Sequence, residues 1–402
     1  MPIYNYIVRD SAGKSLTGTV EAPNPTLAGD ILREHKYVVV SLAEKKEGGI
    51  IQQILQRFRG VAIGEKTVFA RQLATMVSSG LPLTNALEIL RVQAGSDLMS
   101  AALGSMLADI QGGSSLAKSM SKHPDIFDKV TVSLVEAGEA SGKLDVLLTQ
   151  LADHLEKEQD FRSKTRGALI YPAVIGVAML GVFIIMMIFV VPRLTALYED
   201  IGAELPLPTR ILIVISNLLV HGWWALLVAL GVIGFAAYKY LNTDKGRYRI
   251  ASFTFKFPIF GKLSKESELA RFARTLGLLV GAGIPITQAL EIVAAAMGNI
   301  LYRDAILAAE KQVERGVPLS VPIRADPNFD PLVAQMIAVG EETGKLDEVL
   351  EKVAGFFEAQ AGQSVKNLST ALEPIILIVL GVMVGGLVLS IITPIYNLTT
   401  QF

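Results

Sequence analysis

Two copies of one unit occur in this sequence, and the repeat limits the possible folds more than any other feature. The stretch "FARQLATMVSSGLPLTNALEI", which begins at Phe69, aligns without a gap with "FARTLGLLVGAGIPITQALEI", which begins at Phe272. After the loss of one residue, the alignment continues through "GEASGKLD" and "GEETGKLD" and reaches Pro192 and Pro394. A long repeat with a single deletion predicts two copies of one structural module, each including the apolar run at its end.

The chain contains long apolar runs that predict membrane spans. Hydrophobic residues make up 51% of the 402 residues and charged residues only 19%, with a mean hydropathy of +0.45. This composition is more apolar than that of an ordinary soluble protein. The runs 167–192 and 372–397 are long enough to cross a hydrocarbon core of about 30 Å. A third span is predicted at 222–241, where Trp223 and Trp224 mark the membrane interface.

The distribution of basic residues predicts the orientation of these spans. Lys and Arg are frequent before the first span and after the second, and none follows Pro394. The positive-inside rule therefore places the N-terminus and both modules in the cytoplasm and the C-terminus outside. The span at 222–241 has no counterpart in the repeat, and it is needed to return the chain to the cytoplasm. The intervening external segment, 193–221, is predicted to include an interfacial helix.

Three residues mark the predicted boundaries of the repeated spans. Pro172 and Pro374 occupy equivalent positions in the two copies. Glu373, which directly precedes Pro374, is the only acidic residue close to an apolar core. We expect its side chain to reach the cytoplasmic interface, in preference to a role as a proton relay within the membrane.

Outside the spans, apolar residues recur every three to four positions, which indicates helices. Glycine, proline and serine punctuate the first module, at 61–166, into six predicted helices, and the second module, at 242–370, repeats them. Strand-like segments around one helix predict a small α+β domain at 1–44, and 45–60 is predicted to be a linker. The predicted fold is mainly α: a polytopic membrane protein with two homologous six-helix cytoplasmic modules, three transmembrane helices and a small N-terminal α+β domain.

The phrase "GEASGKLD" and its second copy form the candidate functional motif. It resembles a phosphate-binding loop, but only three residues separate Gly138 from Gly142, and Leu144 stands where a magnesium-binding Ser or Thr is required. Two interpretations stay open. The favoured one is a turn between helices with a left-handed glycine cap, and the other is a contact with a partner protein. The residues concerned are Gly138, Glu139, Gly142, Gly340, Glu341 and Gly344.

The remaining polar residues give little support for chemistry. Glu136, Glu139 and Asp145 are a weak candidate set of oxygen ligands for a cation, without the spacing of a calcium-binding loop. Cysteine is absent and the four histidines are scattered, so we expect these histidines to be solvated or interfacial. We predict no catalytic residues and no cofactor. For the equivalent residues Arg71 and Arg274 we expect a solvated helix face, with partner contact as the alternative.

The stretches "FARQLATMVSSGLPLTNAL" and "VSLVEAGEASGKLDVLL", their second copies and "ALEPIILIVLGVMVG" closely resemble a known family. This is the family of inner-membrane platform proteins of type II secretion and type IV pilus assembly (the GspF/PilC family). The resemblance covers nearly the whole chain, including "ELPLPTRIL" before the predicted second span and "TPIY" near the end.

Membership of this family implies a bacterial inner-membrane platform without enzymatic activity of its own. Such a platform connects a cytoplasmic hexameric ATPase to the extraction of pilin or pseudopilin subunits and their addition to a filament. Other inner-membrane assembly components and further copies of the chain are the remaining implied partners. A net charge of −1 gives no reason to expect nucleic acid among them. The alternatives are a transporter and a membrane scaffold or receptor outside such a machine.

Overall fold

The computed structural model describes residues 3–9, 15–23, 25–34, 37–44, 60–193, 210, 213–214, 216–218, 222–241, 243–256 and 258–399. The chain divides into two compact units, Met1–Ala62 and Ile63–Phe402. The predicted linker at 45–60 and the predicted external segment at 193–221 lie almost entirely outside the described residues.

The first unit contains a small antiparallel sheet and one helix among its described residues. Its elements are β1 (Ile3–Arg9), β2 (Ser15–Glu21), α1 (Pro25–Glu34) and β3 (Val38–Glu44). The strand order is β2-β1-β3, and the register of β1 with β3 shifts between Ile7 and Val8. Ala28 of α1 is buried together with Ala22, and Ile31 packs against them.

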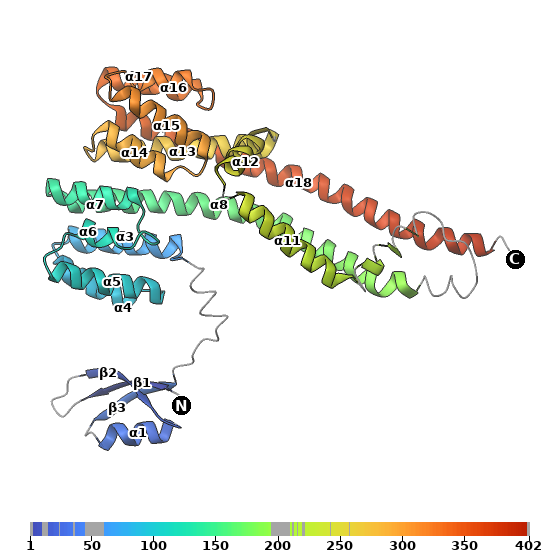
Figure 1. Ribbon diagram of the computed structural model, residues 1–402, viewed down its shortest axis with the longest axis horizontal. Coiled ribbons are helices and arrows are strands. Elements are labelled where there is room, and N and C mark those ends of the chain that lie inside the picture. Colours follow the sequence, from blue (N-terminus) through green and yellow to red (C-terminus); the bar gives the residue numbers. More distant parts are fainter. Residues whose placement is uncertain are drawn as a thin grey trace. The chain divides into compact units, whose positions relative to one another are not determined.

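Module 1 begins the second unit and consists of short helices that lead into one long helix (Figure 1). Polar N-caps begin three of them, because the side chains of Ser96, Ser115 and Asp128 accept hydrogen bonds from backbone N–H groups of the first turn. The helices are α3 (Ile63–Ser78), α4 (Leu83–Gln93), α5 (Asp97–Gln111), α6 (Leu116–Ser121), α7 (Lys129–Ser141) and α8 (Leu144–Ile185).

Module 2 repeats this order of helices and is preceded by two others. The preceding helices are α11 (Trp223–Leu241) and α12 (Asp244–Lys256). The repeated ones are α13 (Pro258–Gly281), α14 (Ile286–Ala296), α15 (Ile300–Val313), α16 (Ser320–Ala325), α17 (Pro331–Thr343) and α18 (Leu346–Thr399).

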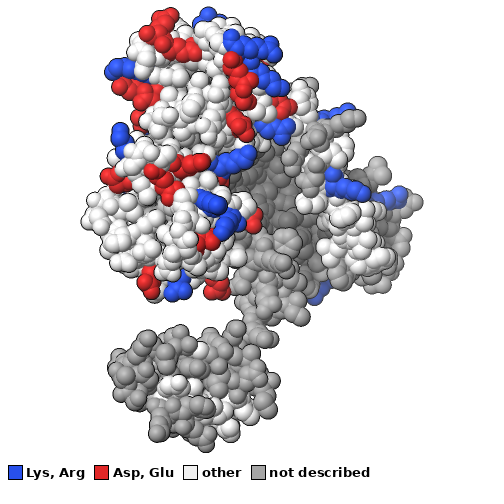
Figure 2. Space-filling model, turned by 60° about the vertical axis from the view of Figure 1, so that its left-hand side comes forward, with Lys and Arg blue, Asp and Glu red and all other residues white. Residues whose placement is uncertain are grey.

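Each module encloses its own apolar core. Module 1 buries Leu73, Met106 and Leu148 among others, and module 2 buries the equivalent row of side chains on α13, α15 and α18, including Leu276 and Leu350. Burying a side chain of this size contributes roughly 1.5–3 kcal/mol, so the long helices are held to their modules mainly by apolar packing. Basic and acidic side chains are intermixed over the visible face of the modules (Figure 2).

Two helical segments are long and apolar enough to cross a membrane among the described residues, Leu144–Arg193 and Leu346–Gly386. Only 11% and 6% of their apolar windows are buried inside the structure. Val177 and Val382, for example, are both 72% exposed, which is the apolar surface expected of a membrane-spanning helix. The apolar stretch of α11, Leu227–Leu241, is shorter, and the predicted third crossing, with Trp223 and Trp224 at its start, stays a prediction.

Pro172 and Pro374 lie inside α8 and α18 and do not end these helices. Proline has no N–H, so Pro172 leaves the carbonyl group of Ala168 without its helical donor. The hydroxyl group of Ser369 on α18 donates to this carbonyl oxygen at 2.8 Å. The proline therefore creates a contact between the two long helices, while its predicted place at a membrane boundary stays a prediction, as does that of Glu373.

A second irregularity lies at the far end of α8, where Met186–Val190 form a π-helical turn. A π turn disturbs the regular hydrogen bonding of the helix. The hydroxyl group of Ser216 donates to the carbonyl oxygen of Met187 at 2.5 Å. Met187 and Val191 are buried there, and Met383 of α18 packs against them. The apolar parts of α8 and α18 therefore contact each other near this end.

Candidate functional site

The glycine-bracketed motif forms the turn that leads from each module into its long helix. Gly142 ends α7 and Gly344 ends α17, both with φ of 69°. This left-handed conformation is the one expected of a glycine helix cap. The backbone N–H of Lys143 donates to the carbonyl oxygen of Gly138 at 3.0 Å, and Lys345 does the same to Gly340 at 3.1 Å. The motif thus fixes the direction in which each long helix starts.

The first glycine of each motif is required by close packing. A Cβ atom on Gly138 would lie 3.1 Å from Cα of Leu144. On Gly340 it would lie 2.9 Å from Cα of Leu346, closer than real contacts allow. Any larger residue would therefore push the first turn of the long helix away from the helix before it.

The glutamate of each motif caps a third helix. Oε1 and Oε2 of Glu139 accept hydrogen bonds from the backbone N–H groups of Leu116 and Ala117, at 2.6 and 3.0 Å. These are donors of the first turn of α6, which have no partner inside the helix. A carboxylate is especially favourable there because helix N-termini carry partial positive charge.

Glu341 has the same role in module 2, with one additional bond. Its carboxylate accepts from the N–H groups of Leu319 and Ser320, at 2.5 and 3.2 Å, and from the hydroxyl group of Ser320 at 2.6 Å. This capping role was not predicted from the sequence, where the glutamates were candidates only for a partner contact, a cation site or a turn. Each motif therefore connects a short helix, the helix before the turn and the long helix after it.

The weak cation-binding prediction receives no support from the positions of its residues. Glu136 and Asp145 are exposed, whereas Glu139 is engaged by backbone donors. Among the described residues, no group of three or more His, Cys, Asp or Glu side chains is placed to hold a metal ion.

The equivalent arginines Arg71 and Arg274 both pair with the long helix of their module, a contact that was not predicted. Arg71 stays partly exposed to solvent, whereas Arg274 is largely buried. Nε and Nη2 of Arg71 donate to the two carboxylate oxygens of Glu156, at 2.6 and 2.8 Å. Nη2 also donates to Asp153 at 2.5 Å. These hydrogen bonds raise the pKa of Arg71 and lower that of Glu156. A solvated face was expected from the helical pattern alone, which carries no information on a partner so distant in sequence.

Arg274 forms the equivalent pair with Glu358. Its side chain is 12% exposed, whereas that of Arg71 is 36% exposed. The repeat aligns both members of the pair, Arg71 with Arg274 and Glu156 with Glu358. A planar guanidinium group that binds a carboxylate holds the two helices at a fixed rotation.

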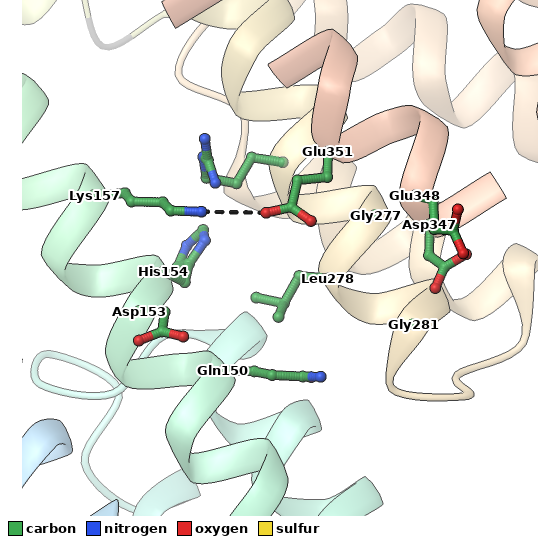
Figure 3. A pocket seen from close by; sticks show the side chains of 11 residues that line it. Gln150, Asp153, His154, Lys157, Gly277, Leu278, Gly281, Asp347, Glu348 and Glu351 are labelled. Carbon is green, nitrogen blue, oxygen red and sulfur yellow. Dashed lines mark hydrogen bonds and ion pairs between the residues drawn. The ribbon is translucent and has the colours of Figure 1, made fainter. Parts of the chain in front are cut away.

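A cleft of about 200 Å³ lies between α8 of module 1 and helices α13 and α18 of module 2. Figure 3 shows Lys157 reaching across it to Glu351, and the Nζ–Oε1 distance is 3.3 Å. Leu278 lies on the opposite wall from His154. This ion pair and the hydrogen bond between Ser369 and Ala168 are polar contacts that join the long helix of one module to that of the other.

His154 corrects the expectation of solvated histidines. Its Nδ1 atom is buried without a hydrogen-bond partner, as is Oε1 of Gln150 in the same cleft. Burial lowers the pKa of His154, and the nearby carboxylates of Glu158 and Asp128 oppose this effect. His154 is therefore a neutral side chain at the contact between the modules.

Comparisons with known proteins agree with the internal repeat. A family model described as type II secretion system (T2SS), protein F, matches twice, at residues 69–192 and 272–394. The model of the N-terminal domain of type II secretion system protein F matches residues 1–43.

Relatives match over almost the whole chain. The type IV pilus assembly protein PilC of Thermus thermophilus is 37% identical over 99% of this chain and 98% of its own. PilC of Pseudomonas aeruginosa is 37% identical over 82% of this chain and 89% of its own. The type II secretion system protein F of the same bacterium is 32% identical over 99% of both chains.

Proposed function

The chain belongs to the type II secretion system protein F family, and from this membership we propose that it is an inner-membrane assembly platform. In this role it couples a cytoplasmic hexameric ATPase to the extraction of pilin or pseudopilin subunits from the membrane and their polymerisation. Relatives of this chain are named as components of pilus assembly and of type II secretion. We propose no catalytic step and no cofactor for the chain itself.

One observation carries the proposal, which is the continuity of α8 and α18. α8 runs for 42 residues and α18 for 54 residues, each from the glycine turn of a module into an apolar segment. An α-helix rises 1.5 Å per residue and resists bending. A displacement of either module by a motor is thus transmitted along a helix into the lipid, where a subunit would be extracted.

Three contacts between each long helix and its module support this coupling. The glycine turn, the glutamate cap and the arginine–glutamate pair each fix the long helix to its module at a different point. Without them, a module could rotate about the turn and the helix would not follow.

We propose that both modules lie in the cytoplasm and that the C-terminus is outside, as the distribution of Lys and Arg predicts.

Partner contact through the motif stays part of the proposal, but on neighbouring side chains. The carboxylates of Glu139 and Glu341 are occupied by the caps. Glu136, three residues before Glu139, and Glu342, directly after Glu341, are exposed. We propose that the ATPase contacts one or both of these exposed carboxylates. Further copies of the chain are the other proposed partners.

Affinity purification of the full chain in mild detergent tests the platform proposal. The expected result is co-purification of a secretion-type ATPase and of pilin-like subunits. Purification of the intact protein without either partner, from cells that assemble filaments, would contradict the proposal.

A flexible insertion tests the coupling separately. We propose inserting Gly-Ser-Gly into α8 between Asp160 and Phe161, with the same insertion in the predicted linker at 45–60 as the control. The α8 insertion should leave ATPase binding intact and abolish filament assembly, whereas the linker insertion should support assembly. Normal assembly with the α8 insertion would show that force does not travel along this helix.

A further inference from the structure

A groove of about 670 Å³ lies between α8 and α18 close to the beginning of their apolar runs. Asp160, Phe161 and Lys164 line it from α8, and Gly362 and Lys366 are among the lining residues from α18. The groove lies between two contacts of the long helices. On the side of the modules the Lys157–Glu351 ion pair joins them, and on the apolar side the Ser369–Ala168 hydrogen bond does so.

The charge of this groove comes from a duplicated lysine. Lys164 and Lys366 precede Pro172 and Pro374 by the same interval, so they are equivalent in the repeat. Both side chains are exposed, and among the described residues neither takes part in an ion pair. Two like charges thus line one groove, and an anion bound between them would interact favourably with both.

The other charged residues of the groove do not neutralise these lysines. Lys157 is paired with Glu351, and the carboxylate of Glu358 is engaged by Arg274. Asp160 supplies one negative charge against two positive ones. The groove therefore has a net positive charge, with the half-buried ring of Phe161 as an apolar part of its wall.

The position of the groove along the helices indicates an amphipathic ligand. Lys366 is the last basic residue of the chain, and the uncharged run of α8 begins at Gly167. Immediately beyond the groove, Ile170 and Ile375 are more than half exposed. A ligand that fits both surfaces has an anionic head at the lysines and an apolar tail along these side chains.

We propose that this groove binds an anionic phospholipid, with the phosphate between Lys164 and Lys366 and the acyl chains along the exposed apolar surface of α8 and α18. The bound lipid would fill the space between the two long helices where they enter the membrane. The leaflet that supplies it follows from the proposed orientation, whereas the binding itself does not depend on the platform function.

Calorimetric titration of the delipidated full-length protein in a neutral detergent tests the proposal. The probes are a short-chain phosphatidylglycerol, the matching phosphatidylcholine and free glycerol phosphate. Phosphatidylglycerol should bind more tightly than either of the other two. The double variant Lys164→Gln/Lys366→Gln should lose roughly 30-fold in affinity for phosphatidylglycerol, about fivefold for each lysine. The control Lys352→Gln, an exposed lysine of α18 outside the groove, should not change it.

Several results would overturn the assignment. Equal binding of the two phospholipids, or unchanged affinity in the double variant, would show that the lysines do not select an anionic headgroup. Glycerol phosphate that binds as tightly as the lipid would identify a simple anion site. An acidic peptide that binds more tightly than the lipid would identify a protein-docking groove. Circular dichroism must first show that the variants keep the helical content of the native protein.

Discussion

In module 1 the ring of Phe69 packs on that of Phe127, with centroids 5.6 Å apart, whereas the equivalent rings in module 2 belong to a row of four. Phe272 packs on Phe329 at 5.1 Å, and Phe329 packs on Tyr302 at 5.2 Å. Phe255 of α12 completes the row. In module 1, Met99 stands at the position of Tyr302.

The contact between the long helix and its module is also closer in module 2 than in module 1. Gly277 and Gly281 let α13 approach α18 closely, where module 1 has the larger Ala74 and Ser78 on α3. The ion pair of Arg274 with Glu358 is also less exposed than the ion pairs of Arg71. The same arrangement of helices is thus packed differently in the two modules, and module 2 is the more tightly packed copy.

Removing one aromatic ring should have the largest effect and should separate the modules. We expect Phe329→Ala to cost about 3–5 kcal/mol of local stability, because the side chain is buried. Phe127→Ala should cost roughly 0.5–1.5 kcal/mol less, since Phe127 lacks the second ring partner. Hydrogen exchange measured by mass spectrometry in detergent reports the stability of each module separately. An equal loss in the two modules would contradict the difference in packing.

The glutamate caps should have the next largest effect. Glu139→Ala and Glu341→Ala should each destabilise the module concerned by about 2 kcal/mol, because charged hydrogen bonds to helix N–H groups are lost. The loss should be greater for Glu341, whose carboxylate also accepts from Ser320. Exchange of the α6 and α16 amides measures both. The matched variants Glu139→Gln and Glu341→Gln keep an acceptor and should be milder.

The arginine clamps should show smaller effects that differ in their response to salt. Arg71→Lys should cost less than about 1 kcal/mol, because exposed ion pairs contribute little and are screened by salt. Arg274→Lys should cost more and should depend less on salt, since its pair is mostly buried. Unfolding at low and high ionic strength measures both dependences. A similar salt dependence for the two variants would contradict the proposed difference between the exposed pair of Arg71 and the buried pair of Arg274.

The smallest predicted effect is the pH dependence that His154 gives to module 1. Burial lowers the pKa of His154 below the ordinary value of 6.5, with Arg274 acting in the same direction and Glu158, Asp128 and Glu358 opposing it. Below pH 6.5 the unfolded chain therefore binds a proton that the folded chain does not. The contribution of His154 to stability is present above this pH and is lost as the pH falls toward the lowered pKa.

The residue at the equivalent position of α18 supplies the matching variant. Because this residue is Phe356, His154→Phe makes module 1 resemble module 2. The variant should flatten the change in hydrogen exchange of α8 between pH 7 and pH 5, a range that begins above the ordinary histidine value of 6.5 and extends below it. An unchanged slope would show that His154 does not titrate with folding.

Much of the helix order could be predicted because local signals mark the helix ends. Pro82, Asp97, Gly113 and Gly142 lie at or next to the observed boundaries. The long helices are also consistent with the sequence, since no proline lies between either glycine turn and the apolar run that follows it. Pro172 could have suggested a break, but the structure keeps the helix and supplies a donor from α18.

The contacts of the site were not predicted, since they join residues far apart in sequence. Glu139 and Leu116 are on different helices, as are Arg71 and Glu156. One signal was nevertheless available in the sequence. Each of these pairs has an equivalent pair in the second copy, and a charged pair kept in both copies of a repeat is a candidate for a direct contact.

The central claim is that each module and its membrane helix move as one body. The chain has no cysteine, so spin labels can be placed without removing native thiols. We propose Val92→Cys with Val182→Cys in the first copy and the equivalent Ala295→Cys with Val384→Cys in the second. Distances measured by double electron–electron resonance in lipid nanodiscs should form one narrow distribution for each pair, and the module 2 distribution should be the narrower. A broad or divided distribution would show that the modules pivot freely on their helices and would contradict the proposed coupling.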